Sequence, residues 1–272
     1  MTVIYVLMVK NTPIRRLFPR KKRRNRAEAR RQIVEKDPAQ RFFDSLRERL
    51  DRSLSLCYDK TPISTKGGHS VKNIITIQHT QSVHHLNGMV GSWTDWDLSD
   101  LGRQQADNIG RNLVDYVGEA KFVLYSSDLK RAAQTAEAIG KHLRLTPILR
   151  TELREGNLGK ACGKSVQWLR ENLEQPEKSV DDRLFSDGES RRDIWNRLLP
   201  FFNEIMENDE ENIILVSHGG LLSVFNTMFQ GLPVESMNTC ELWGGAGSVS
   251  RMTVKNDGKR MIRCMGDLSF LK

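Results

Sequence analysis

Two histidines stand directly after apolar runs of the chain. Residues 74–77 (Ile-Ile-Thr-Ile) lead to His79 two positions on, and residues 212–217 (Asn-Ile-Ile-Leu-Val-Ser) lead to His218. Short apolar runs rich in β-branched residues predict buried strands of a parallel sheet, and such sheets bind ligands just beyond the carboxyl ends of their strands. His79 and His218 therefore stand where a general base or a nucleophile is commonly found. A histidine that makes only local hydrogen bonds is the alternative that either position leaves open.

A third apolar run ends in hydroxyl groups and is followed by an arginine. Residues 122–127 (Phe-Val-Leu-Tyr-Ser-Ser) precede a helix that we expect to begin near Asp128, and Arg131 lies one turn into it. The N-termini of helices at Asp128 and Gly219 favour an anion, and a guanidinium can pair with two phosphate oxygens at once. Because no metal motif is present, a histidine would serve as the nucleophile of a phosphoryl transfer.

Strands that alternate with helices surround these residues. The sequence predicts strands at 74–78, 122–126, 146–149, 212–217, 249–254 and 260–265, and helices at 100–116, 128–143, 165–173, 191–208 and 219–230. The last two strands flank residues 256–258 (Asn-Asp-Gly), which is a hairpin turn signal. This alternation predicts an α/β fold, a three-layer α/β/α sandwich whose central sheet is mostly parallel with an antiparallel C-terminal edge.

Positive charge is concentrated at the front of the chain. Residues 1–70 hold 18 Lys/Arg against 7 Asp/Glu, a net of +11, so the remaining residues carry −3 of the overall +8. We therefore expect a basic N-terminal extension of residues 1–70, partly disordered or helical, and one domain of residues 71–272. The run at 20–24 (Arg-Lys-Lys-Arg-Arg) suits contact with an anionic surface or nucleic acid, but a solvated tail has the same composition. Residues 37–54 predict an amphipathic helix, and residues 58–70 a linker.

Composition argues against several classes of protein. No apolar run approaches the length of a membrane span. The apolar residues 1–9 are followed rather than preceded by positive charge, which is the reverse of an export signal. Four scattered cysteines (Cys57, Cys162, Cys240 and Cys264) form no C-x-x-C pair, so we expect neither a disulfide framework nor a zinc site. These features predict a cytoplasmic protein.

Five motifs follow one another between about residues 72 and 267. They occupy residues 78–82 (QHTQS) with 98–106 (LSDLGRQQA), 126–136 (SSDLKRAAQTA), 153–159 (LREGNLG), 188–190 (GES) and 216–220 (VSHGG). In this order the motifs resemble those of the histidine phosphatase superfamily, in its phosphoglycerate-mutase-like branch. Several motifs in one order are far more specific than any single motif.

The resemblance implies a role for each matching residue. His79 would be the nucleophile that becomes phosphohistidine, with its other ring nitrogen donating to a backbone carbonyl. Arg131 would bind phosphate oxygens, His218 would donate to the same phosphate, and Glu155 would give a proton to the leaving oxygen and later activate water. Further residues that we expect to contact phosphate or substrate are Gln78, Ser82, His85, Asn87 and Gly219.

The chain departs from the family pattern beside the nucleophile. Gln78 stands where the family has arginine, and Thr80 where it has glycine. Loss of one charge-assisted hydrogen bond costs about 1.5–3 kcal/mol, so phosphate binding could be weakened roughly ten- to a hundredfold. We also expect the Thr80 side chain to crowd the phosphate. His85 stands where asparagine is common in the mutase branch, and Asn87 could take the place of that asparagine.

A pair of adjacent histidines, His84 and His85, follows the nucleophile. A metal site with His79 is one interpretation, but this spacing is not a recognised ligand set, and we expect no metal. The preferred interpretation is that one of the two supplies positive charge in place of the missing arginine. Trp93 and Trp96 would wall the pocket or pack under the loop.

The resemblance implies a phosphatase that acts on a small phosphorylated metabolite without cofactor or metal. Phosphoglycerate mutase activity is the less favoured alternative, because it needs a closed, multiply basic pocket and only Lys160 and Lys164 follow Gly159 in a short loop. A second alternative is a phosphoester-binding protein with weakened catalysis, which Gln78 and Thr80 suggest. Since every motif lies at or beyond residue 72, residues 1–70 should be dispensable for catalysis.

Overall fold

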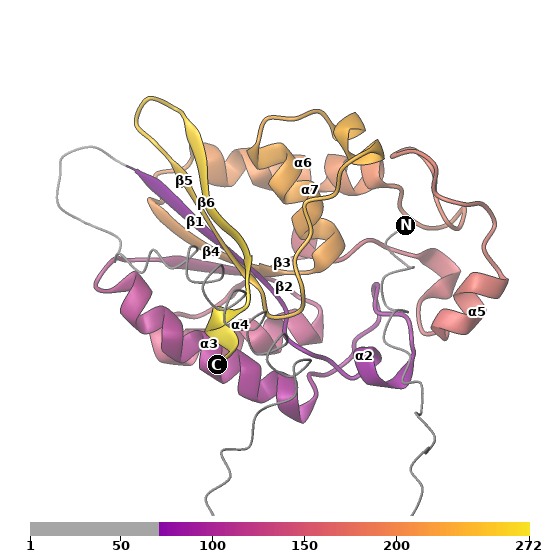
Figure 1. Ribbon diagram of the computed structural model, residues 1–272, viewed down its shortest axis with the longest axis horizontal. Coiled ribbons are helices and arrows are strands. Elements are labelled where there is room, and N and C mark those ends of the chain that lie inside the picture. Colours follow the sequence, from indigo (N-terminus) through magenta and orange to yellow (C-terminus); the bar gives the residue numbers. More distant parts are fainter. Residues whose placement is uncertain (1–70) are drawn as a thin grey trace, which may run out of the picture. The chain divides into compact units, whose positions relative to one another are not determined.

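The computed structural model describes residues 71–272, which form a mixed α/β fold around one sheet (Figure 1). The expectations for residues 20–24, 37–54 and 58–70 lie outside the described residues. The strands are β1 (Lys72–Gln78), β2 (Val123–Ser127), β3 (Ile148–Arg150), β4 (Asn212–Ser217), β5 (Val249–Val254) and β6 (Arg260–Asp267). The helices are α2 (His84–Asn87), α3 (Asp100–Val117), α4 (Lys130–Leu143), α5 (Val166–Glu171), α6 (Arg191–Glu207) and α7 (Gly219–Phe229). Four 3-10 turns lie at Thr151–Leu153, Gly159–Ala161, Val234–Asn238 and Ser269–Leu271.

The sheet has six strands in the order β3-β2-β4-β1-β5-β6. Strands β3, β2, β4 and β1 are parallel, while β5 and β6 are added as antiparallel neighbours. Gln78 of β1 pairs with Ser217 of β4, and Ser126 of β2 pairs with Val216 of β4. The carboxyl ends of these three strands therefore meet at one edge, as the sequence predicts.

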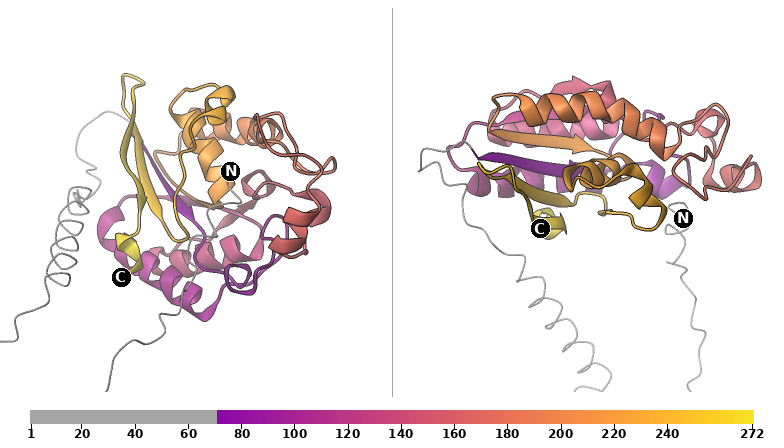
Figure 2. Two further views of the ribbon diagram at one scale, coloured as in Figure 1. Left: turned by 45° about the vertical axis from the view of Figure 1, so that its right-hand side comes forward. Right: turned by 90° about the horizontal axis from the view of Figure 1, so that it is seen from above.

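Side chains that alternate along the strands fill two separate cores. Ile74, Ile213 and Leu215 pack with α6 and α7 on one face. Ile75 and Ile77, among others, pack with α3 and α4 on the opposite face. All five are at most 1% exposed, and burial of each contributes about 1.5–3 kcal/mol. Figures 1 and 2 show the same two helix layers on either side of the sheet, which confirms the predicted three-layer sandwich.

The helix after β2 begins later than the sequence predicts. Asp128 does not cap it, because its carboxylate accepts from the Arg154 guanidinium, with Arg154 Nε at 2.7 Å. Helix α4 begins at Lys130, whose backbone N–H donates to Asp95 Oδ1 at 3.0 Å. This N-terminus is therefore satisfied by a carboxylate of the protein, which the predicted anion site at Asp128 did not foresee.

The loop after β1 is pressed closely against the start of α3. A Cβ on Gly102 would lie 1.8 Å from the Gln81 carbonyl oxygen, so only glycine fits at this approach. The Thr80 hydroxyl donates to the Gly102 carbonyl at 2.8 Å. Thr80 is fully buried and its hydroxyl points toward α3, so the expectation that its side chain crowds the phosphate is not supported.

The loop at 84–98 contains the short helix α2. None of the four residues of α2 is buried. Figure 1 shows α2 and α5 beyond the carboxyl end of the sheet. Across residues 71–272, no helix combines the length and apolar character needed to cross a bilayer.

Candidate active site

His79 emerges from β1 with both ring nitrogens engaged. Its Nδ1 lies 2.8 Å from the Thr80 carbonyl oxygen. Because a carbonyl can only accept, Nδ1 carries the hydrogen and Nε2 keeps a free lone pair. The ring is 4% exposed. The backbone has thus fixed the tautomer that a nucleophile at Nε2 requires.

Arg131 of α4 points at that lone pair. Its Nε donates to His79 Nε2 at 3.2 Å, and its two terminal nitrogens donate to the carbonyls of Thr94 and Ser92 at 2.9 and 2.8 Å. The guanidinium is 1% exposed. Since arginine has five N–H donors and three are used here, two remain for oxygens of a ligand. Nothing in the sequence indicated that Ser92 or Thr94 would contact this arginine.

His218 occupies the N-cap position of α7 beside His79. The two ring centroids are 5.1 Å apart in an edge-to-face arrangement. His218 Nε2 lies 2.8 Å from Ser127 Oγ at the end of β2. Its Nδ1 is buried and has no hydrogen-bond partner among residues 71–272. A buried ring nitrogen without a partner is costly unless something binds it, so Nδ1 is available to a ligand.

Glu155 is held against the N-terminus of α7. Its carboxylate accepts from the backbone N–H groups of Gly220 and Leu221, both at 3.1 Å, and of Gly156 at 2.9 Å. Gly219 opens the helix, so its N–H has no partner within the helix. This side chain therefore lies next to His218, and its negative charge acts on the Arg131 guanidinium.

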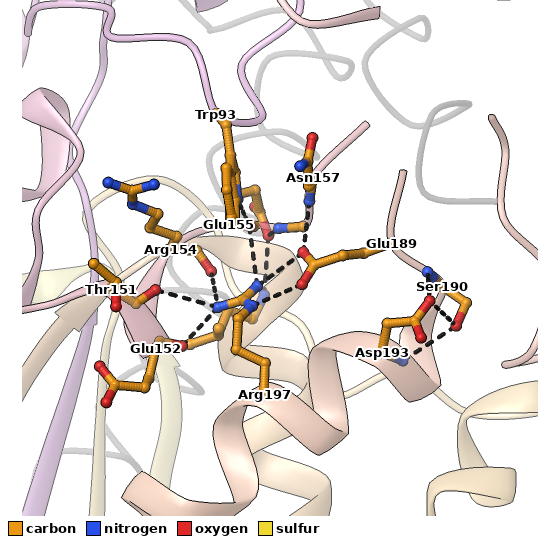
Figure 3. A network of polar contacts seen from close by, with 12 residues as sticks. Trp93, Thr151, Glu152, Arg154, Glu155, Asn157, Glu189, Ser190, Asp193 and Arg197 are labelled. Carbon is orange, nitrogen blue, oxygen red and sulfur yellow. Dashed lines mark hydrogen bonds and ion pairs between the residues drawn. The ribbon is translucent and has the colours of Figure 1, made fainter. Parts of the chain in front are cut away.

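Arg197 of α6 anchors the segment that carries Glu155. Its guanidinium donates to the carbonyl oxygens of residues 151, 152, 154 and 155 and to the carboxylate of Glu189 (Figure 3). Trp93 Nε1 donates to the Glu155 carbonyl as well, at 2.6 Å. Sequence reasoning missed Arg197, because one arginine within a charged helix gives no signal of its partners.

Gln78 and Trp243 share the space over Gly219. A Cβ on Gly219 would lie 2.6 Å from Trp243 Nε1 and 3.1 Å from Gln78 Oε1. Gln78 is buried, and in the part of the chain that the structure describes its Oε1 has no hydrogen-bond partner. Glycine at this position therefore leaves room for two polar groups at the helix N-terminus. Trp243 was not predicted, although a lone tryptophan in a glycine-rich loop is a usable signal.

Ser82, His84 and His85 form a connected group in the segment after β1. Ser82 Oγ forms a hydrogen bond with His84 Nδ1, and the Ser82 N–H donates to His85 Nδ1 at 3.2 Å. The His85 ring stacks on His79 with centroids 5.5 Å apart. Asn87 is exposed and accepts from the Met89 N–H at 3.0 Å, a local contact. Asn87 was predicted to contact phosphate, but among residues 71–272 it forms no hydrogen bond with Ser82, His84 or His85.

Loss of hydration controls the charge of the four rings. Burial lowers the pKa of both His79 and His218 well below 6.5, and the Arg131 charge lowers it further. Desolvation lowers the pKa of His84 to about 2 and that of His85 to about 4. The buried rings of His79 and His218 are therefore neutral at pH 7 in the ligand-free site, and the same direction of shift favours the neutral form of His84 and His85. The expectation that His84 or His85 supplies positive charge is not supported in this state.

Arg131 remains cationic. Burial lowers the pKa of its guanidinium to about 10, which still leaves it charged at pH 7. The two lysines named for the pocket have other partners: Lys160 pairs with Glu174, and Lys164 lies 5.7 Å from the centre of the Trp168 ring. Trp96 donates to the Val90 carbonyl at 2.8 Å and so supports the loop. The site thus presents one arginine rather than a ring of cations to its nucleophile.

The fold and these motifs define a class of protein, and comparison with known sequences identifies the family. A family model described as "Histidine phosphatase superfamily (branch 1)" matches residues 74–266. The chain belongs to this superfamily.

Three relatives illustrate its range. Glucosyl-3-phosphoglycerate phosphatase of Mycolicibacterium vanbaalenii is 30% identical over 193 residues, covering 66% of this chain and 82% of that protein. The 2,3-bisphosphoglycerate-dependent phosphoglycerate mutase of Bartonella bacilliformis is 27% identical over 184 residues, covering 64% and 89%. The solved mycobacterial glucosyl-3-phosphoglycerate phosphatase superposes with a TM-score of 0.62 at 22% identity, over 72% of this chain and 99% of that one. Both phosphatases and mutases are therefore among the proteins that this chain is similar to.

Proposed function

We propose that this protein is a phosphatase that hydrolyses a small phosphorylated metabolite through a phosphohistidine on His79. The observation that carries the proposal is the fixed His79 tautomer, with Nδ1–H held by the Thr80 carbonyl and the Nε2 lone pair directed at Arg131. A nucleophile set in this way loses little entropy on reaching the attacking geometry.

The reaction has two steps. In the first, Nε2 forms a bond to phosphorus as the ester oxygen leaves, and protonated Glu155 gives its proton to that oxygen. In the second, Glu155 takes a proton from water, the resulting hydroxide attacks the phosphohistidine, and inorganic phosphate leaves while Nε2 regains its lone pair. Atoms and protons balance, and neither a metal nor a cofactor takes part.

Three hydrogen-bond donors, one of them charged, would meet the phosphoryl charge of the transition state. Arg131 has two N–H groups to spare and carries a full charge. If the Ser127 hydroxyl donates to His218 Nε2, the hydrogen of His218 lies on Nδ1, which is the unpartnered nitrogen. The Gly219 N–H would add a third donor. Donors of this kind, fixed before the reaction, are worth about 2.7–4 kcal/mol each.

The charge of the site favours hydrolysis over mutase chemistry. A mutase must hold a bisphosphate and shield its phosphohistidine from water. Here Lys160 and Lys164 have other partners, and Gln78 brings no charge. The relative at 30% identity is a phosphatase, which supports the same choice.

Assay of the full-length protein on p-nitrophenyl phosphate with and without EDTA tests the proposal. We expect release of phosphate that EDTA does not reduce and that His79→Ala abolishes. His142→Ala, at a surface histidine paired with Asp107, is the matched control and should keep its turnover. Loss of activity in EDTA, or full activity in His79→Ala, would refute the mechanism.

Two alternatives have their own signatures. Exchange of 2- and 3-phosphoglycerate that is faster than phosphate release would establish a mutase. The buried, unpaired Oε1 of Gln78 favours the second alternative, a phosphoester-binding protein with weakened catalysis. Binding of vanadate without turnover on a panel of phosphorylated sugars, nucleotides and glycerates would establish that protein.

A further inference from the structure

Three histidines converge at the reactive end of the site. One ring nitrogen from each of His79, His84 and His85 lies within 4.8 Å of those of the other two. Their ring centroids are between 4.0 and 5.9 Å apart. Among residues 71–272 this is the one group of three histidine, cysteine or acidic side chains close enough to share a metal ion. The sequence raised a metal site at these three histidines, but we expected no metal because their spacing is not a recognised ligand set. A short helix, α2, turns two of the rings back toward the first.

The proposed phosphoryl transfer needs only one of these rings. His84 and His85 belong to α2, which buries none of its four residues, so core packing does not account for two adjacent imidazoles there. A Cβ on Gly91 would lie 2.9 Å from His84 Nε2, so glycine at 91 leaves room for that ring. The group is therefore better explained by something that binds to it.

The contacts around two of the three rings, His79 and His84, resemble those of metal-bound histidines. Such rings usually donate their other N–H to an oxygen of the protein. The His79 Nδ1–H meets the Thr80 carbonyl, and His84 Nδ1 forms a hydrogen bond with Ser82 Oγ. Tetrahedral zinc with Zn–N distances of about 2.0–2.1 Å places ligand nitrogens about 3.4 Å apart, so the rings would close in by about 1.4 Å at most. The unburied helix α2 can accommodate that shift.

Two contacts oppose a cation at this position. The Ser82 N–H donates to His85 Nδ1 at 3.2 Å, so that hydrogen bond must break before His85 offers a lone pair to a metal. Arg131 Nε lies 3.2 Å from His79 Nε2, so a bound ion would replace that hydrogen bond and be repelled by the guanidinium. The arginine would keep its bonds to the carbonyls of Ser92 and Thr94. An ion there would therefore be exchangeable rather than permanent.

We propose that His79, His84 and His85 bind a divalent transition-metal ion of the zinc type, and that this ion inhibits the enzyme. Imidazole is a good ligand for zinc, copper and nickel, and three histidines with one water form a known zinc coordination set. The ion would occupy the Nε2 lone pair that attacks phosphorus, so metal and phosphoryl group exclude each other. The inhibitory half of this inference rests on the proposed function, whereas the binding half does not.

Titration calorimetry of the full-length protein with zinc chloride, without substrate or phosphate, tests the binding half. We expect one tight ion per chain, with affinity reduced at least tenfold in His84→Gln and in His85→Gln. His142→Gln removes a histidine outside the cluster and should leave the affinity unchanged. Equal affinity in wild type and both cluster variants, or no zinc binding at all, would overturn the proposal.

Competition tests the inhibitory half. Saturating orthovanadate should weaken zinc binding at least tenfold, and by linkage zinc should weaken vanadate binding by the same factor. Independent binding of the two would refute inhibition at Nε2. If zinc binds through the three histidines but no phosphoester is hydrolysed, the proposed function fails and the metal site stands. If phosphoesters are hydrolysed and zinc does not bind, the metal site alone fails.

Discussion

The two sides of the site are built differently. On the side of β2 and β4, Arg131, Glu155 and His218 stand in motifs that match the family, and each is held by backbone groups or a neighbouring hydroxyl. Every departure from the family pattern that is named above lies in residues 78–87, which are the last residue of β1 and the segment that follows it. These departures run from Gln78 to the histidine pair of α2. We refer to these as the β2–β4 side and the β1 segment.

We infer from this difference that the β2–β4 side serves the phosphoryl transfer and that the β1 segment serves substrate recognition. The β2–β4 side fixes the direction and charge of phosphoryl transfer through buried contacts that tolerate little change. The β1 segment contributes His79 but otherwise presents neutral groups: an amide, and two rings whose pKa values are lowered by desolvation. Changes in the β1 segment should therefore alter what binds and how tightly, while changes on the β2–β4 side should abolish turnover.

Arg131→Gln should have the largest effect of the variants that spare the nucleophile. It removes the charged group that contacts His79, so kcat/KM should fall about 10²–10³-fold. Steady-state assays on p-nitrophenyl phosphate measure this, with Arg111→Gln as control because Arg111 pairs with Asp107 at the surface. A loss of less than tenfold would mean that the β2–β4 side does not hold the phosphoryl group.

Gln78→Arg should alter binding in the opposite direction. The added charge should tighten vanadate binding by about 1–3 kcal/mol, or roughly ten- to a hundredfold. Adding Thr80→Gly should give no further gain and should lower stability, because the Thr80 hydroxyl bonds to the Gly102 carbonyl rather than facing the ligand. Titration of both variants with vanadate decides this. If neither variant binds vanadate more tightly than the wild type, the β1 segment is adapted to a substrate that Gln78 recognises.

Acid should destabilise the protein through the buried rings. The pKa values of His79 and His218 are lowered well below 6.5 by burial, so the folded protein leaves these rings unprotonated while the unfolded chain takes up protons. Their contribution to stability is therefore complete above pH 6.5 and is lost as the pH falls below it. Urea unfolding at pH 7.5 and 5.5 should show this loss, and His218→Gln should reduce it. Equal pH dependence in the two proteins would contradict the neutral rings.

Removal of residues 1–69 should have the smallest effect. Every catalytic motif lies at or beyond residue 72, so a chain that begins at Ser70 should fold and keep its kcat/KM within about twofold. Assay and thermal unfolding of the shortened chain check this. A chain that fails to fold would show that the extension is part of the core.

Much of the fold followed from the sequence because its signals are local. Apolar runs and the Asn-Asp-Gly turn are each read from a few neighbouring residues. The positions of His79 and His218 at one edge of the sheet were predicted because each follows an apolar run that was expected to be a strand. Each of these signals lies within a single helix, strand or turn.

What the sequence did not reveal depends on contacts between distant segments. Asp95 satisfies α4 from another loop, Arg197 ties the Glu155 segment to α6, and Trp243 meets Gln78 over Gly219. The convergence of His84 and His85 on His79 depends on a four-residue helix too short to give a periodic pattern. The charge of the His79 and His218 rings could not be predicted either, because it is set by their burial.

Capture of the covalent intermediate tests the central claim most directly. The full-length protein is mixed with p-nitrophenyl phosphate, quenched in alkali within milliseconds, digested and analysed by mass spectrometry. The account predicts one phosphoryl group on the peptide that contains His79, and none in His79→Asn. Turnover without a phosphorylated peptide, or a phosphoryl group on His84, His85 or His218 instead, would contradict it.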